Sequence, residues 1–228
     1  GIGNGISLII MIGIIARLPQ SLGLEFMARI EQEGGGLVAF LVEILIMYIV
    51  FMLTILLVQG TRRIPVQYAK RIVGNKQYGG VRQYIPLKVN AAGVMPIIFA
   101  QALMFIPITI AGFASSDSAT GLAATFSNIT GFWYNFTNAV LIILFTYFYT
   151  AVTINPTQMA EDMKKNGGFI PGVKPGRKTA EFLDSIMSKI TLPGSIFLAL
   201  VAIMPAFAML AGVNRSFAQF FGGTSLLI

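Results

Sequence analysis

Residues Leu37–Val58 read LVAFLVEILIMYIVFMLTILLV, an unbroken apolar run whose one charged residue is Glu43. A helix of about 20 mostly apolar residues crosses the hydrocarbon core of a bilayer, and this run has that length. It lacks the strict alternation of apolar and polar residues that marks the strands of membrane barrels. Because only helices and closed barrels satisfy the backbone inside lipid, the run predicts a membrane-spanning α-helix.

The rest of the chain belongs to the same compositional class. Of its 228 residues, 55% are hydrophobic and 11% are charged, and the mean hydropathy of +0.76 lies outside the range of ordinary soluble domains. We therefore predict an all-α fold, a polytopic transmembrane helical bundle. Two of its windows are shorter than a standard span, so they either extend into their flanks or lie tilted. The further apolar windows are Ile6–Ala16, Ala91–Phe113, Ala139–Ile154 and Ile190–Leu210, with another beginning near Gly223.

Lysine and arginine are concentrated in two of the segments between these windows. Residues 59–90 carry seven cations and no acid, and residues 155–189 carry six cations and four acids. Thirteen of the sixteen cations thus lie in two alternate loops, which the positive-inside rule assigns to the cytoplasm. The other loops, with Arg17, Arg29 and Arg215, are predicted to face outward.

Both basic loops carry signals of ordered structure. Arg63–Tyr68 alternates as a strand does, Gly74–Asn75 supplies turn residues, and Tyr78–Ile85 has the length to return, which together predict a twisted β-hairpin. In the second loop, Asn155–Pro156 predicts the start of a short helix, because asparagine caps helices and proline suits the first helical position. That helix is predicted to end at Asn166–Gly168.

The sequence excludes most enzyme chemistry. It has no cysteine and no histidine, which removes disulfides, thiol nucleophiles, imidazole acid–base catalysis and the common zinc sites. The glycines of Gly1–Gly5 have no strand before them and no Lys-Ser/Thr pair after them, so a phosphate-binding loop is rejected. We expect no catalytic residue, no metal site and no cofactor, and we predict that the protein is not an enzyme.

Glu43 is the one ionisable residue well inside a predicted span. An intramembrane carboxylate suggests a proton or ion site. The other interpretation is a structural role at the interface or facing a lumen. No other predicted span supplies a charged companion, so the structural interpretation is favoured and the role of Glu43 stays open.

Both ends of the chain are predicted to lie inside a longer protein. No basic region precedes the first apolar run, which follows Gly1 almost directly, and Ser225–Ile228 reads as the opening of another apolar segment. We therefore expect the sequence to be a fragment.

Several segments, in order along the whole chain, resemble the SecY family of protein-translocation channels. The resemblance implies that the chain corresponds to family helices five to nine with the start of helix ten. It also implies a bacterial protein of the cytoplasmic (inner) membrane. The segments are Gly1–Ser7, Arg62–Ile64, Tyr68–Arg71, Pro86–Pro96, Phe145–Thr150, Asn155–Pro156, Phe169–Gly176 and Phe221–Ile228.

The resemblance also divides the chain into five parts. Residues 1–58 correspond to transmembrane helices five and six with an outer loop. Residues 59–90 are the basic cytoplasmic loop, and 91–154 are helices seven and eight on the side of the lateral gate. Residues 155–189 are the second cytoplasmic loop, and 190–228 are helix nine with the start of ten.

The resemblance implies a ring of aliphatic side chains at the waist of the channel. Carried over by position, this pore ring consists of Ile6, Ile10, Ile98 and Ile228. Ile6 and Ile10 are four residues apart and so share one face of a helix. Stiff, apolar side chains close around a threaded chain and resist ions by dewetting. The alternative is that these isoleucines simply face lipid, the most favourable place for them in a membrane helix.

Two polar residues of the third window are assigned by resemblance to the lateral gate. Asn90 and Gln101 are expected on or near that seam, and the alternative is a purely packing role in an interhelical hydrogen bond. With Asn90, Pro96, Gln101 and Pro107 in it, this window is expected to be interrupted and kinked.

In the family, the two basic loops dock the ribosome and the SecA ATPase. The excess of cations without acids fits an anionic partner surface, although topology alone also demands cations there. Lys174 keeps a positive charge at the loop tip but lacks the bidentate fork of arginine. The assigned residues are Arg62, Arg63, Lys70, Arg71, Lys76, Lys174, Arg177 and Lys178.

The function implied is the central channel-forming subunit of a Sec protein translocase. Such a subunit passes unfolded secretory proteins across the membrane and releases membrane helices through a lateral gate. The implied partners are SecE and SecG type subunits, the SecA ATPase, the ribosome, signal sequences, nascent polypeptide and membrane lipids, but not DNA. The alternative is a secondary transporter with a midplane substrate site, which needs polar side chains converging from several spans.

Overall fold

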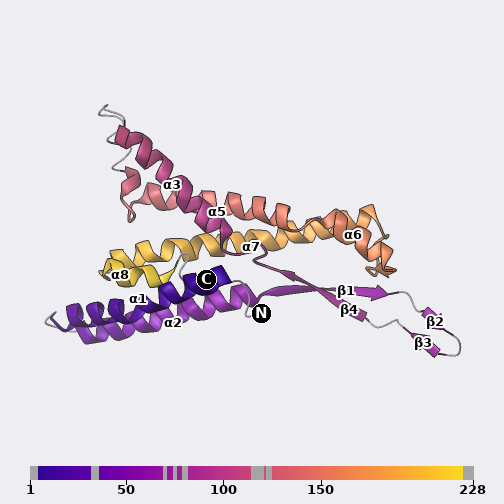
Figure 1. Cartoon of the computed structure of the whole chain (residues 1–228), viewed down its shortest axis with the longest axis horizontal. Coiled ribbons are helices and arrows are strands. Elements are labelled where there is room, and N and C mark those ends of the chain that lie inside the picture. The colour runs from indigo at the N-terminus through magenta and orange to yellow at the C-terminus, as the bar shows by residue number, and fades with distance from the viewer. Residues whose placement is uncertain are drawn as a thin grey trace.

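The computed structural model describes residues 5–31, 36–68, 71–73, 76–78, 82–113, 121 and 125–222. Most of the helices run along the longest axis of the molecule, and strands project from one end (Figure 1). Within these residues three segments are long and apolar enough to cross a membrane, Gly36–Gln59, Phe132–Lys165 and Arg177–Leu210, and a shorter apolar helix covers Met95–Ile110. The chain is a multi-pass membrane protein, and the predicted helical bundle is confirmed.

The first two helices, α1 (Gly5–Ile30) and α2 (Gly36–Gln59), form a hairpin. Helix α1 continues far beyond Ala16, so the prediction that Arg17 and Arg29 lie in an outer loop was wrong. In the added part, Leu18 and Leu22 pack on a buried cluster, and the polar residues Ser21, Glu25 and Arg29 are buried beside them. A search for continuous apolar runs misses such a segment, because these polar residues interrupt the run.

Three further helices form a layer beside this hairpin: α3 (Met95–Phe113), α5 (Phe132–Thr153) and α7 (Arg177–Leu210). Helix α5 lies between the other two, contacting both. The buried core of the layer combines small and branched side chains, and small residues allow membrane helices to approach closely. Its members are Ile97 and Ala100 of α3, Ile142 of α5, and Leu198 and Ala199 of α7.

Helix α3 begins later than the third apolar window predicts. Asn90 lies in a turn before the helix, and Pro96 is its second residue, where the missing N–H would be unpaired in any case. Only Pro107 lies inside the helix. The expectation that Asn90 and Pro96 interrupt the span was therefore wrong.

The first basic loop forms the predicted β-hairpin. Strand β1 (Thr61–Tyr68) pairs antiparallel with β4 (Arg82–Lys88), and β2 (Arg71–Val73) pairs with β3 (Lys76–Tyr78). In β1 the buried residues Ile64 and Val66 are separated by the exposed Pro65, which is the two-residue period of a strand with one covered face.

The second basic loop joins the first. Helix α6 (Pro156–Lys165) leads into strand β5 (Gly168–Phe169), which pairs with β1 and makes a three-stranded sheet in the order β4-β1-β5. We call the unit of strands β1 to β4, α6, residues 168–176 with β5, and residues 177–190 of α7 the loop module. Its core consists of Ile64, Val66, Leu87, Met163, Ile170, Leu183 and Met187.

The helix predicted in the second loop is also confirmed. The side chain of Asn155 accepts hydrogen bonds from the backbone N–H groups of Thr157 at 3.2 Å and Gln158 at 3.3 Å, and Pro156 takes the first helical position. The helix ends at Asn166, and Gly167 follows with a φ of 69°, a left-handed conformation that favours glycine.

At the end opposite the loop module, a short segment joins the hairpin to the layer. Helix α8 (Arg215–Ala218) and the single turn η1 (Gln219–Phe221) follow α7 and bury Phe217, Phe220 and Phe221. Ile14, Leu18 and Leu22 of α1 and Met47 of α2 pack against this cluster. The two helical groups therefore share a core at this end.

Candidate functional site

Ile98 is the one member of the predicted pore ring whose side chain lies within the described part of the chain. It lies in the first turns of α3 and is 42% exposed, whereas its neighbours Ile97 and Ala100 are fully buried against the layer. Ile98 therefore points away from the packed side of α3. Ile6 and Ile10 are on α1 with only their backbone described, and Ile228 lies outside the described residues.

Aromatic rings join α3 to α5 next to Ile98. Phe99 lies 5.4 Å from Tyr149 and 6.1 Å from Phe145, measured between ring centroids. Such tilted pairs add to the energy of area burial. This contact fixes the rotation of α3 about its axis, and therefore the direction of Ile98.

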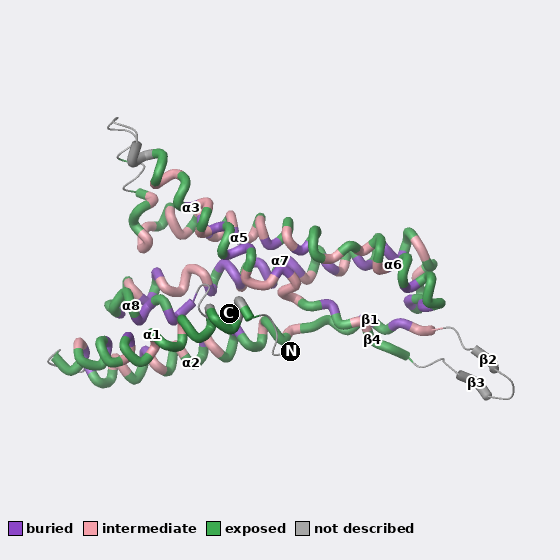
Figure 2. The backbone as a smooth tube through the Cα atoms, in the orientation of Figure 1, coloured by how far each residue is buried: buried purple, intermediate pink, exposed green. Residues whose placement is uncertain are grey.

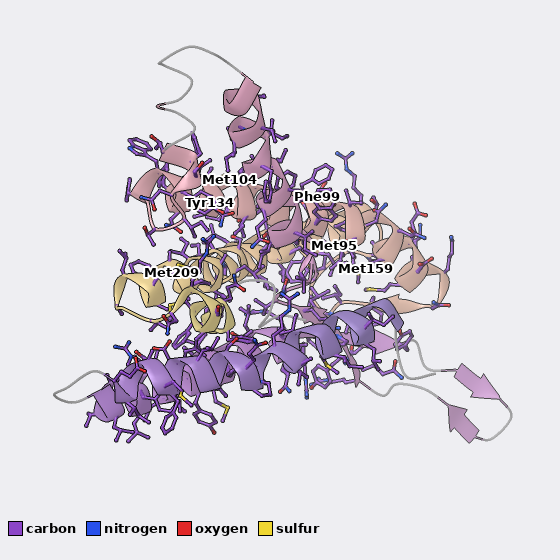
Figure 3. The ribbon with its side chains drawn as sticks, turned by 60° about the vertical axis from the view of Figure 1, so that its left-hand side comes forward. Met95, Phe99, Met104, Tyr134, Met159 and Met209 are labelled. Carbon is purple, nitrogen blue, oxygen red and sulfur yellow. The ribbon has the colours of Figure 1, made fainter. Side chains whose placement is uncertain are left out.

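A cavity of about 370 Å³ lies where α1, α3, α5 and α7 approach the α8 segment. Gln101 lines it, as do Tyr134 and Met209, which are labelled in Figure 3. Asn90, the other predicted gate residue, does not line this cavity and lies in the turn before α3. The polar and charged lining residues are Arg17, Gln101, Tyr134, Asn135, Asn138, Arg215 and Gln219.

The polar residues of α5 in this cavity were missed by sequence reasoning. Asn138 is buried, and its side-chain oxygen has no hydrogen-bond partner among the described residues. The amide nitrogen of Asn135 donates to the carbonyls of Ile129 and Gly131, each at 2.9 Å. The available signal was two asparagines three residues apart at the start of an apolar run, since that spacing places both on one helical face.

The assigned basic residues whose side chains are described lie on one body, the loop module. Arg62 and Arg63 of β1 are exposed, as are Lys174 before α7 and Arg177 and Lys178 in its first turn. Arg177 pairs with Glu181 at 3.2 Å on the surface. Of the remaining assigned residues, Arg71 and Lys76 are on β2 and β3 with only their backbone described, and Lys70 lies outside the described residues.

Arg82 is a further basic residue of this surface, not assigned from the sequence. It lines a shallow depression together with Arg63 and Tyr84. In the β1–β4 register Arg63 is opposite Pro86 and Arg82 is opposite Gln67, so the two arginines share one face of the hairpin four residues apart. Two guanidinium groups beside an aromatic ring suit an anionic or stacking partner.

A buried ion cluster connects α1, α2 and the turn after α7. Arg29 donates from Nε to Glu25 Oε1 at 3.0 Å, and from Nη2 both to Glu43 Oε1 and, at 3.1 Å, to the carbonyl of Gly212. The other oxygen of Glu25 accepts from the backbone N–H of Asn214 at 3.0 Å. All three ionic residues are at most 8% exposed.

The cluster corrects the sequence interpretation of Glu43. We expected no charged companion from another span, but Arg29 lies on α1 and pairs with it. The error follows from the predicted end of the first helix, which left Arg29 in a loop. The favoured structural role of Glu43 is consistent with this pairing, which holds three parts of the chain together.

The whole of residues 1–228 matches the family model described as SecY. This chain belongs to the SecY family. The resemblance drawn from the sequence segments is thereby confirmed.

Among its SecY relatives, the chain is 43% identical to the protein translocase subunit SecY of Chlamydia trachomatis over 234 residues, covering 100% of this chain and 51% of that protein. It is 44% identical to the subunit of the same name from Mycobacterium tuberculosis over 237 residues, covering 100% and 52%. The chain thus spans about half the length of these relatives. They give no support to the secondary-transporter alternative.

Two solved structures show the same fold. One is described as the structure of a protein conducting channel, with a TM-score of 0.54 and 18% identity over 100% of this chain and 56% of that one. The other concerns the plug domain of SecY, which is said to stabilise the closed state of the translocation channel. Its TM-score is 0.50, with 18% identity over 96% of this chain and 55% of that one.

Proposed function

We propose that this chain forms the C-terminal half of the channel subunit of a Sec protein translocase in the bacterial cytoplasmic membrane. The subunit passes unfolded secretory proteins across the membrane and releases membrane helices sideways. The match of all 228 residues to SecY, with relatives called protein translocase subunits, carries this proposal. The subunit catalyses no reaction itself, and the ribosome or the SecA ATPase supplies the driving force.

In this proposal, Ile6, Ile10, Ile98 and Ile228 form the pore ring, and Gln101 and Asn90 lie along the lateral gate. The exposure of Ile98 on the unpacked side of α3 supports its part in the ring. The cavity beside Gln101 is lined by both polar and apolar residues, which supports the assignment of Gln101 to a lateral gate.

Crosslinking tests the pore assignment. A photoreactive residue replaces Ile98 in the full-length protein, and a secretory chain is stalled in the translocase. The matched control is Ile110, an isoleucine of the same helix that is 64% exposed and lies about 120° around the axis from Ile98. We expect the stalled chain to be captured from position 98 and not from position 110. Equal capture from both positions, or none from position 98, contradicts the assignment.

The loop module is proposed as the docking surface for the ribosome and SecA. We expect Arg63→Glu with Lys76→Glu to weaken binding of either partner. The loss should be largest at low salt and shrink as salt rises, because salt screens the charges and the variant has fewer cationic contacts that depend on it. The control is a single charge reversal, Arg215→Glu, at the opposite end of the molecule. Unchanged binding of both partners at low salt shows that these cations serve topology only.

The proposed SecE and SecG type partners are membrane helices that cover apolar faces of the bundle. Helix α2 offers such a face, since only Gly36, Glu43, Val50 and Thr54 are buried along it. Most of its other residues are exposed (Figure 2), so they can contact lipid or partner helices.

A further inference from the structure

Helix α5 has two opposite faces. Asn138, Ile142, Thr146 and Thr150 are buried at intervals of four residues, and α5 packs against α7. A second row, offset by two residues and therefore by about 200° around the helix, is exposed throughout. This exposed row consists of Phe132, Phe136, Val140, Leu144, Phe148 and Val152.

Phe132 and Phe136 of the exposed row lie beside Trp133, and we call these three residues the aromatic trio. Phe132, Trp133 and Phe136 are 72%, 61% and 52% exposed, respectively. Their ring centroids lie 5.8 Å apart for Phe132 and Trp133, 5.9 Å for Phe132 and Phe136, and 6.4 Å for Trp133 and Phe136. The rings therefore contact one another while most of their surface stays uncovered.

The stretch of chain around the trio carries no charge. No lysine, arginine, aspartate or glutamate occurs between Asp117 and Glu161. This stretch therefore offers no charge to pair with an acidic or basic protein partner. Uncharged aromatic rings at the end of a membrane helix match the boundary between headgroups and acyl chains, where tryptophan gathers in membrane proteins.

The length of α5 places the trio at that boundary. The opposite end of the helix is fixed by the loop module, because Ile154 packs on the module core and Asn155 caps α6. The 22 residues of α5 extend about 33 Å, close to the roughly 30 Å of a hydrocarbon core. If one end lies at the membrane surface next to the module, the first turn lies at the other surface.

We propose that the aromatic trio anchors α5 in the phospholipid headgroup region of the leaflet opposite the loop module, with the rest of the exposed row facing acyl chains. The anchor sets the depth of the helix that packs between α3 and α7. The proposal rests on the membrane spans and not on the channel function, so either can fail without the other.

Trp133 makes the proposal directly measurable, because it is the one tryptophan of the sequence. The full-length protein, with every tryptophan outside residues 1–228 replaced by phenylalanine, is reconstituted in phosphatidylcholine–phosphatidylglycerol vesicles. These contain lipids with a nitroxide quencher either near the headgroup or near the end of the acyl chain. We expect Trp133 to lose more fluorescence to the shallow quencher than to the deep one.

A matched variant calibrates depth on the same helix face. Trp133→Phe combined with Leu144→Trp moves the fluorophore 11 residues along α5, or about 16 Å toward the bilayer centre. Leu144 is 58% exposed, much as Trp133 is. In this variant the order of quenching should reverse, with the deep quencher removing more fluorescence.

Three results would overturn the proposal. Stronger quenching of Trp133 by the deep lipid places the trio inside the hydrocarbon. Protection from both lipids and from aqueous iodide shows that another part of the protein covers the rings. Strong quenching by iodide with none by either lipid places the trio in water, outside the membrane.

Discussion

At the scale of single residues, the guanidinium of Arg29 connects carboxylates of two helices with a backbone carbonyl of a third segment. Inside a protein such a group is costly to desolvate, and its partners are left as buried charges when it is removed. The arrangement therefore depends on all of its members being present together.

The first prediction concerns this cluster. Arg29→Ala should destabilise the protein by about 3–5 kcal/mol, because Glu25 and Glu43 lose their counter-charge while remaining buried. The measurement is the midpoint of thermal unfolding of the purified full-length protein in detergent.

The chain offers a matched control for Arg29. Arg177 pairs with Glu181 at the same four-residue spacing, but the side chains are 93% and 61% exposed. Arg177→Ala should change the free energy of unfolding by less than about 1 kcal/mol, since exposed pairs are screened by water. Equal effects of the two substitutions would show that the Arg29 cluster does not hold the helices together.

Residues with a local role were the ones that sequence reasoning predicted best. The cap at Asn155 depends on a hydrogen bond from the backbone of Thr157, two residues away, so the local sequence is enough to predict it. The pairing of Glu43 with Arg29 depends on where α1 ends and how α2 returns beside it. No rule of spacing contains that information.

A second prediction follows for Asn155. Asn155→Ala should destabilise the loop module by about 1 kcal/mol through loss of the cap, whereas Asn155→Asp should keep most of the stability because its oxygen still accepts from the backbone. Hydrogen exchange of the amides of α6 measures the difference. Equal protection in both variants would contradict a capping role.

At the scale of elements, α7 comes unusually close to the turn before α3. A Cβ atom on Gly194 would lie 2.9 Å from the backbone oxygen of Val89, a distance that real side chains avoid. Glycine at this position lets the two backbones meet, as small residues do between membrane helices.

The third prediction tests this contact. Gly194→Ala should destabilise the protein by about 1–3 kcal/mol, since overpacking forces backbone shifts. Gly23→Ala, on α1 with no heavy atom within 4 Å of the added carbon, is the control. It should be neutral or raise the unfolding midpoint through the better helix propensity of alanine. A higher midpoint for the Gly194 variant would refute the close approach.

The strands of the loop module show which pairings a repeating sequence pattern can predict and which it cannot. Alternating residues and a turn signal gave β1 and β4, because both signals lie within one loop. Strand β5 has two residues, Gly168 and Phe169, and two residues carry no period. Its pairing with β1 joins positions about a hundred residues apart, so only the folded chain reveals it.

At the scale of the whole molecule, the pairing of β1 with β5 joins the two basic loops into one folded unit.

The fourth prediction uses the absence of cysteine from the sequence. Gln67 faces Phe169 across the β1–β5 ladder, and facing residues have Cα atoms about 4.5–5.5 Å apart, within the range of a disulfide. Gln67→Cys with Phe169→Cys should therefore crosslink under mild oxidation.

A protease site inserted beside Gly121, between the two loops, gives the readout. With the crosslink, the two fragments should stay together on a non-reducing gel and separate on reduction. Arg62→Cys with Phe169→Cys is the control, because five residues of strand place the first thiol about 16 Å away. Crosslinking of the control pair as readily as the test pair would disprove a fixed sheet.

The bundle itself was predictable from composition, since apolar windows of sufficient length leave few alternatives in a membrane. The cavity beside Gln101 was not, because its lining comes from α1, α3, α5, α7, α8 and η1. Residues such as Asn138 and Arg215 carry no joint signal until the helices are placed. The pore-ring and lateral-gate residues were assigned by family resemblance, because composition and spacing alone did not single them out.

Helix α7 runs for 34 residues, about 51 Å, from the loop module to the segment that anchors α1. No proline occurs between Arg177 and Leu192, while Pro193 and Pro205 each remove one backbone hydrogen bond further along. If the loop module is pulled, the part of α7 before Pro193 should therefore move as a rigid helix, and Pro193 is the first position at which α7 can bend easily. Pro193 is next to Gly194, which contacts Val89 just before α3. A force on the loop module would therefore act on the start of α3.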